Sequence, residues 1–287
     1  MIAAERLPPI RVDRTVPSRI ARFQDPWVPF PEGIAVIKEM KRLLDRPDEG
    51  RPKSLALLAD PSFGKSHLLD YFADCFPDIA DPEPPRIQVL SIELPPEADS
   101  VKLLRELLRS LKVDYSLRHP SDELLRKVVV HVQSMRVGLI VVDEFHNALS
   151  GRRDRVLGVL QTVRGLSNRG GRPIVVAGTT KVKEVLRNDE QLNQRFVQWQ
   201  LPLWNDVAYV MSLLSNFEQT FGSTKSGTLS TEANAKIVIN LSKGRPGTIA
   251  TLLRESHREA LRINGGVIDK AVLDGCAELL VGRTVTA

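Results

Sequence analysis

A lysine and a serine follow a glycine where an apolar run gives way to a helical apolar pattern. Residues 55–58 are typical of a buried strand, and Gly64-Lys65-Ser66 opens the helical segment. This order favours a phosphate-binding loop, because free amides at a helix N-terminus attract an anion. Lys65 would reach the β- and γ-phosphates, and the Ser66 hydroxyl would ligate Mg2+. The residues expected around the nucleotide are Asp60, Pro61, Ser62, Phe63, Gly64, Lys65, Ser66 and His67.

The loop departs from the usual glycine-rich pattern at its first position. Ala59 stands where the pattern has glycine, and it can serve there if its φ angle stays negative. Pro61 removes one of the amides that could face an anion. An ordinary strand-to-helix turn can carry the same glycine, lysine and serine, so the loop needs a second motif to support it.

That second motif is an acidic pair, Asp143-Glu144, which follows a further apolar run at 139–142. Such a run is typical of a strand buried on both faces of a parallel sheet, and open α/β sheets bind ligands at the C-terminal ends of their strands. Asp143 would hold Mg2+, and Glu144 would polarise an attacking water. The alternative is a pair that only caps the next helix. The lysine loop upstream, in the expected order, favours the catalytic interpretation.

Apolar strands with helices between them would position these residues. Further buried strands are expected at 87–94 and 174–177, and further helices at 34–44, 101–111 and 121–135. Asp99 or Ser100 would cap the helix at 101–111, and Ser121 the helix at 121–135. The fold class predicted is therefore α/β, a parallel P-loop sheet flanked by helices.

Three regions are expected along the chain. Residues 1–33 form an extended arm rich in proline and arginine, which packs on the main domain, reaches a neighbour or is a frayed tail. Residues 34–203 form the nucleotide-binding α/β domain. Residues 204–287 form a small all-α lid, because the strand patterns stop at Trp204 and helical spacing follows. The lid helices are expected at 206–221, 230–241, 248–263 and 269–280.

Several further polar residues lie where they could contact a nucleotide. Thr179 and Thr180 end the strand at 174–177, so one of their hydroxyls could sense the γ-phosphate. Arg195 suits a residue that reaches the nucleotide of an adjacent subunit, with Arg187 as the next candidate. Arg245, near the start of the third lid helix, could turn toward the phosphates. A solvated helix face is the interpretation of Arg254, Arg258 and Arg262.

Composition allows a nucleic-acid partner. The chain of 287 residues has a formal net charge of +5 and a pI near 9.3. Arginines gather between 151 and 172 with Asp154 as the only acid, so they would neutralise phosphates or form a solvated charged face. The members of this cluster are Arg152, Arg153, Arg155, Arg164, Arg169 and Arg172.

Neither a membrane span nor a secretory signal is expected. No apolar run approaches the roughly 20 residues that cross a bilayer, and the N-terminus is charged and interrupted by proline. We therefore expect a cytoplasmic protein. Cys75 and Cys276 are expected to be small core residues without a disulfide.

Taken together, the motifs resemble those of an AAA+ ATPase of the TniB family of transposition ATPases, which is related to TnsC. The resemblance covers residues 15–280. The segments that carry it are GKS at 64–66, VVDEFHN at 141–147, AGTT at 177–180, QRF at 194–196 and GRPGTI at 244–249.

The resemblance implies a DNA-bound regulator of transposition that uses ATP and Mg2+. Such proteins assemble as rings or helical filaments on double-stranded DNA and link a DDE-type transposase (TniA/TnsB-like) to a TniQ-like target-selection protein. It makes Thr179 (or Thr180) sensor 1, Arg195 the arginine finger and Arg245 sensor 2. The positions it suggests for DNA contacts are Lys102, Arg152, Arg153 and Arg155.

Two alternatives stay open at this point. One is a helicase-loader or origin-type AAA+ ATPase, which we expect less because barely 80 residues follow Trp204, too few for a lid and a winged helix. The other is a nucleotide-switch scaffold with slow turnover. The intact Asp143-Glu144 pair argues against a dead site but is compatible with slow hydrolysis.

Overall fold

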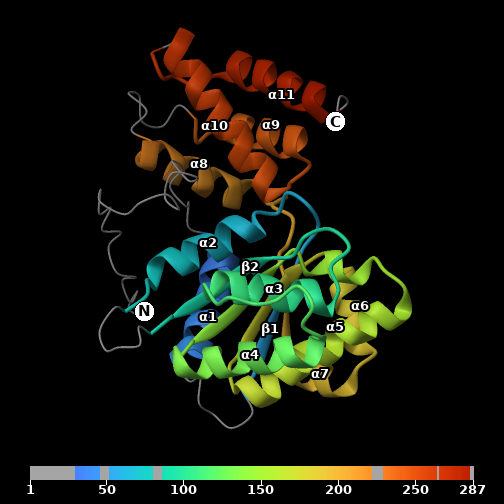
Figure 1. The fold of residues 1–287 in the computed structure, drawn as a ribbon. Helices are drawn as coiled ribbons and strands as arrows, with labels where there is room; N and C mark the ends of the chain where they lie inside the picture. The colour runs from blue at the N-terminus through green and yellow to red at the C-terminus, as the bar shows by residue number, and fades with distance from the viewer. Residues whose placement is uncertain (1–29, 46–51, 80–85, 222–228, 264, 285–287) are drawn as a thin grey trace.

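A parallel sheet of five strands, in the order β2-β3-β4-β1-β5, forms the centre of the larger part of the molecule. The computed structural model describes residues 30–45, 52–79, 86–221, 229–263 and 265–284. The predicted α/β class is confirmed (Figure 1). The strands are β1 (Ser54–Leu58), β2 (Val89–Glu93), β3 (Leu139–Asp143), β4 (Ile174–Gly178) and β5 (Phe196–Gln200).

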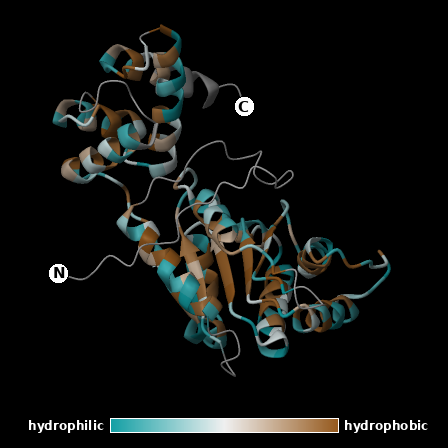
Figure 2. Cartoon of the chain, turned by 90° about the vertical axis from the view of Figure 1, so that its left-hand side faces the viewer, coloured by the Kyte–Doolittle hydropathy of each residue, from teal (hydrophilic) through white to brown (hydrophobic). Residues whose placement is uncertain are grey.

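Alternate residues of the strands point to opposite faces of the sheet and build two separate cores. Leu55 and Leu57 pack with helices on one face, whereas Ala56 and Leu58 pack with helices on the other. Figure 2 shows the resulting hydrophobic strands between helices of mixed hydropathy. The first face is covered by α1 (Pro31–Asp45) and α2 (Lys65–Cys75). The second face is covered by α3 (Ser100–Ser110), α4 (Ser121–Ser134), α5 (Arg153–Gly165), α6 (Lys181–Arg187) and α7 (Glu190–Arg195).

Of the two predicted helix caps, one is confirmed and the other is wrong. Asp99 caps α3, because its side chain accepts a 2.8 Å hydrogen bond from the amide of Lys102. The prediction that Ser121 caps α4 is wrong. Pro120 has the extended backbone that a cap requires, so Ser121 becomes the first helical residue and no side chain caps this helix.

Helices α8 (Val207–Phe221), α9 (Glu232–Ser242), α10 (Pro246–Ile263) and α11 (Lys270–Thr284) form the C-terminal part. They gather at one end of the α/β part (Figure 1), and their core is continuous with the face that carries α1 and α2. Trp204 lies at this junction, with its ring 4.9 Å from that of Phe30 and 5.5 Å from that of Tyr209. The division at 203/204 remains a prediction.

Other expectations are refined by the structure. The sequence indicates only an apolar stretch at 196–203, whereas residues 196–200 form the edge strand β5. Cys276 is buried as expected, but Cys75 is only half-buried; both thiols are free. No described helix is long and apolar enough to cross a membrane. Most of the predicted arm (1–29) lies outside the described residues, as do the segments 46–51, 80–85 and 222–228.

Candidate active site

The loop between β1 and α2 has the shape of an anion site. Its first residue, Ala59, donates a backbone hydrogen bond of 3.1 Å to the carbonyl of Gly178 at the end of β4. Ala59 does not have positive φ, as its substitution for glycine requires, whereas Ser62 and Gly64 do, at 66° and 76°. Gly64 is the N-cap of α2. The strained position in the loop is therefore Ser62, which sequence reasoning did not single out.

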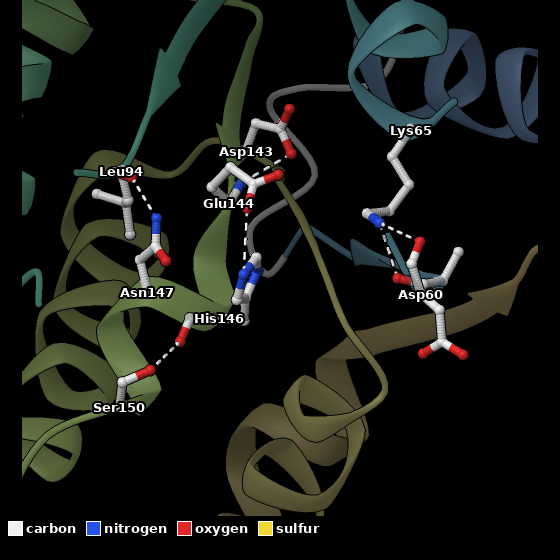
Figure 3. Close-up of polar contacts among 9 residues, drawn as sticks. Asp60, Lys65, Leu94, Asp143, Glu144, His146, Asn147 and Ser150 are labelled. Atoms are coloured by element: carbon white, nitrogen blue, oxygen red, sulfur yellow. Dashed lines mark hydrogen bonds and ion pairs between the residues drawn. The ribbon is translucent and has the colours of Figure 1, made fainter. Parts of the chain in front are cut away.

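Lys65 is held inside this loop. Its Nζ donates hydrogen bonds to the carbonyls of Ala59 (2.7 Å) and Asp60 (3.0 Å), as Figure 3 shows. Burial lowers the pKa of Lys65, and the carboxylates of Asp143, Glu144 and Asp60 act in the opposite direction. Of the three carboxylates, Asp143 has the largest effect on the pKa of Lys65. The structure therefore brings Lys65 and the acidic pair together at one edge of the sheet.

Asp143 and Glu144 lie where β3 ends and the next turn begins. Asp143 ends the strand, is 9% exposed, and accepts a 2.7 Å hydrogen bond at Oδ1 from the amide of Glu144. Glu144 has a φ of 52°, a left-handed conformation that turns the chain sharply. Asp143 thus lies at the end of the strand, and Glu144 lies in the turn that follows it.

A histidine that sequence reasoning did not use contacts Glu144. His146 lies in the short helix η2 (Phe145–Leu149), with its Nε2 3.2 Å from Oε2 of Glu144 (Figure 3). Asn147 in the same turn donates a 2.8 Å hydrogen bond to the carbonyl of Leu94, just after β2. The Asn147 contact holds the turn after the acidic pair against the end of the neighbouring strand. The signal in the sequence was a histidine two positions after Glu144.

The tip of β4 presents a threonine hydroxyl between the two motifs. β4 lies between β1 and β3 in the sheet, and Thr179 directly follows it. Its Oγ1 is buried and has no hydrogen-bond partner among the described residues. Thr180 instead begins α6 as its N-cap. A buried hydroxyl without a partner fits a phosphate oxygen at this place, and this favours Thr179 over Thr180.

The donors present fit a magnesium nucleotide. Ser66 lies in the first turn of α2 and is exposed, and His67 beside it is half-buried. Within the described part of the chain, no cluster of three or more His, Cys, Asp or Glu could hold a metal alone. Magnesium in ATPase sites typically has one or two protein oxygens and the phosphates as ligands. Ser66 and Asp143 offer that set.

The C-terminal helices reach the loop directly. The amide of Gly247, in the first turn of α10, donates a 2.7 Å hydrogen bond to the carbonyl of Ser62. Arg245 is exposed and lines an open cleft of about 610 Å3 beside the start of the loop. The other residues of this cleft are Asp60, Phe63, Gln200, Leu201, Pro202, Leu203 and Lys243.

Arg195 lies at the N-terminal ends of the strands, whereas Lys65 lies beyond the C-terminal end of β1. It immediately precedes β5, whose first residue pairs with the first residue of β1, Ser54. Lys65 comes after the other end of β1, and a strand of five residues is roughly 15 Å long. Figure 1 shows α7 far from the C-terminal helices. The structure therefore does not bring Arg195 to the nucleotide site of its own chain.

The four cations suggested for DNA contacts share one side of the sheet. Lys102 lies in α3, and Arg152, Arg153 and Arg155 lie at the start of α5; all four are exposed. Both helices start from loops at the C-terminal edge of the sheet, and they pack together: a Cβ on Gly158 of α5 would lie 2.9 Å from the hydroxyl of Ser100.

Comparison with known proteins decides the family. The family model described as "Bacterial TniB protein" matches residues 19–206. The chain belongs to the TniB family. No significant match was found among curated protein sequences.

Solved structures confirm the fold of this TniB-family protein. It is similar to ORC2 of Aeropyrum pernix, solved as ADPNP-ADP complexes, with a TM-score of 0.63 and 14% identity over 91% of this chain and 71% of that one. For Cdc6p of Pyrobaculum aerophilum the TM-score is 0.57, with 16% identity over 86% and 67% of the two chains. For domain III of Thermotoga maritima DnaA, a replication initiation protein, it is 0.55, with 16% identity over 91% and 95%.

Family and fold together make this chain an AAA+ ATPase, as the motifs predicted. Binding of a nucleotide with a divalent cation is implied by that class. At these identities the solved structures support the fold alone, so the roles of single residues remain predictions.

Proposed function

We propose that this TniB-family ATPase is an ATP-dependent, DNA-binding regulator of transposition that assembles on duplex DNA as a ring or filament. The observation that carries the proposal is the separation of Arg195 from Lys65 within one chain. Arg195 lies away from the site that Lys65, Asp143 and Glu144 form in its own chain, so in this proposal it stabilises the transition state at the site of another copy.

The chemistry of the proposed site follows from its donors. Bound Mg2+ would supply charge neutralisation at the phosphates, and Ser66 and Asp143 would hold it. Lys65 leaves its contacts with the loop carbonyls to bind the β- and γ-phosphates. Glu144 orients the attacking water and accepts its proton. The Thr179 hydroxyl donates a hydrogen bond to the γ-phosphate, and Arg245 approaches the nucleotide from the C-terminal helices.

Duplex DNA is the proposed partner of the exposed cations. Lys102, Arg152, Arg153 and Arg155 would contact backbone phosphates, which fix position on DNA without reading sequence. In this proposal the DDE-type transposase (TniA/TnsB-like) and the TniQ-like protein bind the assembled form, so that ATP controls when they are linked.

Imaging of the assembly tests this function. The protein would be mixed with duplex DNA and a slowly hydrolysed ATP analogue, with ADP in a parallel sample, and examined by electron microscopy. We expect rings or helices around the duplex with the analogue, and fewer with ADP. Dispersed monomers in both samples would contradict the proposal. Turnover of ATP in the assembled sample distinguishes an active regulator from a nucleotide-switch scaffold.

A further inference from the structure

Helix α7, which ends in Arg195, is fixed at both ends. At its start Asp189 accepts a 3.1 Å hydrogen bond from the amide of Leu192 and pairs at 3.0 Å with Arg164 of α5. At its end Lys53, just before β1, donates a 3.1 Å hydrogen bond to the carbonyl of Gln194. Arg195 therefore projects from a segment whose position is set by α5 and by the sheet.

The side chain of Arg195 is also held. Its Nη1 donates a 3.1 Å hydrogen bond to Oγ of Ser167, which is only 2% exposed. Ser167 lies in η3 (Leu166–Gly170), a π-helical turn that continues α5. A hydroxyl within a helix often bonds a carbonyl of its own preceding turn, as Thr162 does with Gly158 at 2.9 Å. The Ser167 oxygen instead accepts from a residue 28 positions away.

The turn that contains Ser167 is also in contact with α4. Gln133 of α4 donates a 2.8 Å hydrogen bond to the carbonyl of Arg169, which ties the π-helical turn to a second helix. Turns of this type are rare and occur frequently at functional sites. A long arginine side chain has many rotamers, and a contact with a fixed oxygen limits them before the arginine meets its target.

We propose that Ser167, supported by the Arg164–Asp189 pair, is a positioning residue that aims Arg195 at the nucleotide of a neighbouring copy. The inference rests on the proposed function, in which Arg195 acts between subunits. Because α5 begins with the arginines proposed to contact DNA and ends at η3, one helix carries the DNA contacts and the support for Arg195.

Steady-state ATPase assays on DNA-assembled protein measure the effect. Ser167→Ala removes the accepting oxygen, and Asp189→Asn weakens the pair with Arg164 without touching Ser167. We expect each to lower kcat by about tenfold, a small part of the 10³–10⁵ that an arginine finger supplies, with KM and the affinity for a fluorescent ATP analogue unchanged. Ser256→Ala is the matched control, because Ser256 is fully buried in α10 and its hydroxyl has no partner among the described residues.

Mixed assemblies separate this inference from the proposed function. Copies with Ser167→Ala keep an intact Lys65 and Glu144 site, whereas copies with Glu144→Gln keep an intact Arg195. Mixing the two should give more turnover than the sum of the separate samples, because the second copy offers a well-placed arginine to the first. Arg195→Ala mixed with Glu144→Gln should behave in the same way.

The outcomes are distinct. If Arg195→Ala shows no such recovery, Arg195 does not act between subunits, and the proposed function loses its main support. If Arg195→Ala recovers while Ser167→Ala and Asp189→Asn turn over ATP like the wild type, only the positioning inference is overturned. A decrease in Ser167→Ala that mixing does not restore, or a rise in KM, also overturns it, since that points to a general structural defect.

Discussion

The amide of Gly247 in α10 is joined by a 2.7 Å hydrogen bond to the carbonyl of Ser62 in the phosphate loop. These residues are distant in the sequence, yet a Cβ on Gly247 would lie 2.6 Å from that carbonyl oxygen and 3.3 Å from the amide of Gly64. The close approach requires glycine. A movement of the loop on binding phosphate would therefore act directly on the C-terminal helices.

Gly247→Ala should weaken nucleotide binding. The added methyl would push α10 away from the loop, and overpacking of this kind costs roughly 1–3 kcal/mol. We expect the affinity for an ATP analogue, measured by fluorescence titration, to fall by about tenfold. Gly275→Ala in α11 is the control, because nothing lies within 4 Å of the added methyl there. Equal affinities for the two variants would show that the packing of α10 on the loop has no role in binding.

Glu144→Gln should separate binding from hydrolysis. Glutamine has the shape of glutamate and can still contact His146, but it cannot accept a proton from water. We expect turnover to fall by about 10²-fold or more while ATP affinity is retained, so that the variant stays on DNA in the ATP-bound state. Turnover by phosphate release and retention by a DNA pull-down measure the two effects. Turnover within about threefold of the wild type would exclude Glu144 as the catalytic base.

The sequence predicted the parts of the site that depend on local order. Lys65 follows one apolar strand and Asp143 ends another, and because the strands are parallel their C-terminal ends lie on the same side of the sheet. The strand order was not predictable in this way, because it depends on which helices cover which face. The edge strand β5 was harder to recognise, since its residues Val197 to Gln200 are only partly buried or exposed.

Contacts between segments that are distant in the sequence could not be predicted from local sequence patterns. The positive φ of Ser62 and the packing of Gly247 against it depend on how α10 docks, and no local spacing indicates this. The contact of Arg195 with Ser167 likewise joins two elements across the fold. The wrong cap at Ser121 has a local cause: Pro120 already occupied the capping position.

His257 should make stability depend on pH. Burial lowers the pKa of His257 below its ordinary value of 6.5, and its ring lies edge-on to Phe217 with centroids 6.2 Å apart. The unfolded chain then binds more protons than the folded one, so stability present above pH 6.5 is lost as the pH falls below 6.5 and through the lower pKa of the folded state. We expect Tm to decrease more between pH 7.5 and 5.5 in the wild type than in His257→Gln, as measured by calorimetry. Parallel curves would contradict this.

Removal of the exposed cations should reduce the salt dependence of DNA binding. Binding to phosphates releases counterions, so the affinity for duplex DNA decreases as salt is added. The slope of log K against log salt becomes less negative by about 0.9 for each phosphate that the protein no longer neutralises. Replacement of Arg152, Arg153 and Arg155 by glutamine should therefore reduce the slope by up to about 3 if each binds one phosphate. Fluorescence anisotropy with a labelled duplex, at a series of salt concentrations and with an ATP analogue present, gives the slope.

The matched control for this salt series lies in α10. Arg258 and Arg262 are also exposed, but they pair with Glu255 and Glu259 at 2.8 and 2.6 Å on the same helix. Their replacement by glutamine removes the same kind of charge where a carboxylate already balances it. We expect the salt slope of this double variant to match that of the wild type. If it fell as much as in the α5 variant, binding would depend on net charge rather than on the start of α5.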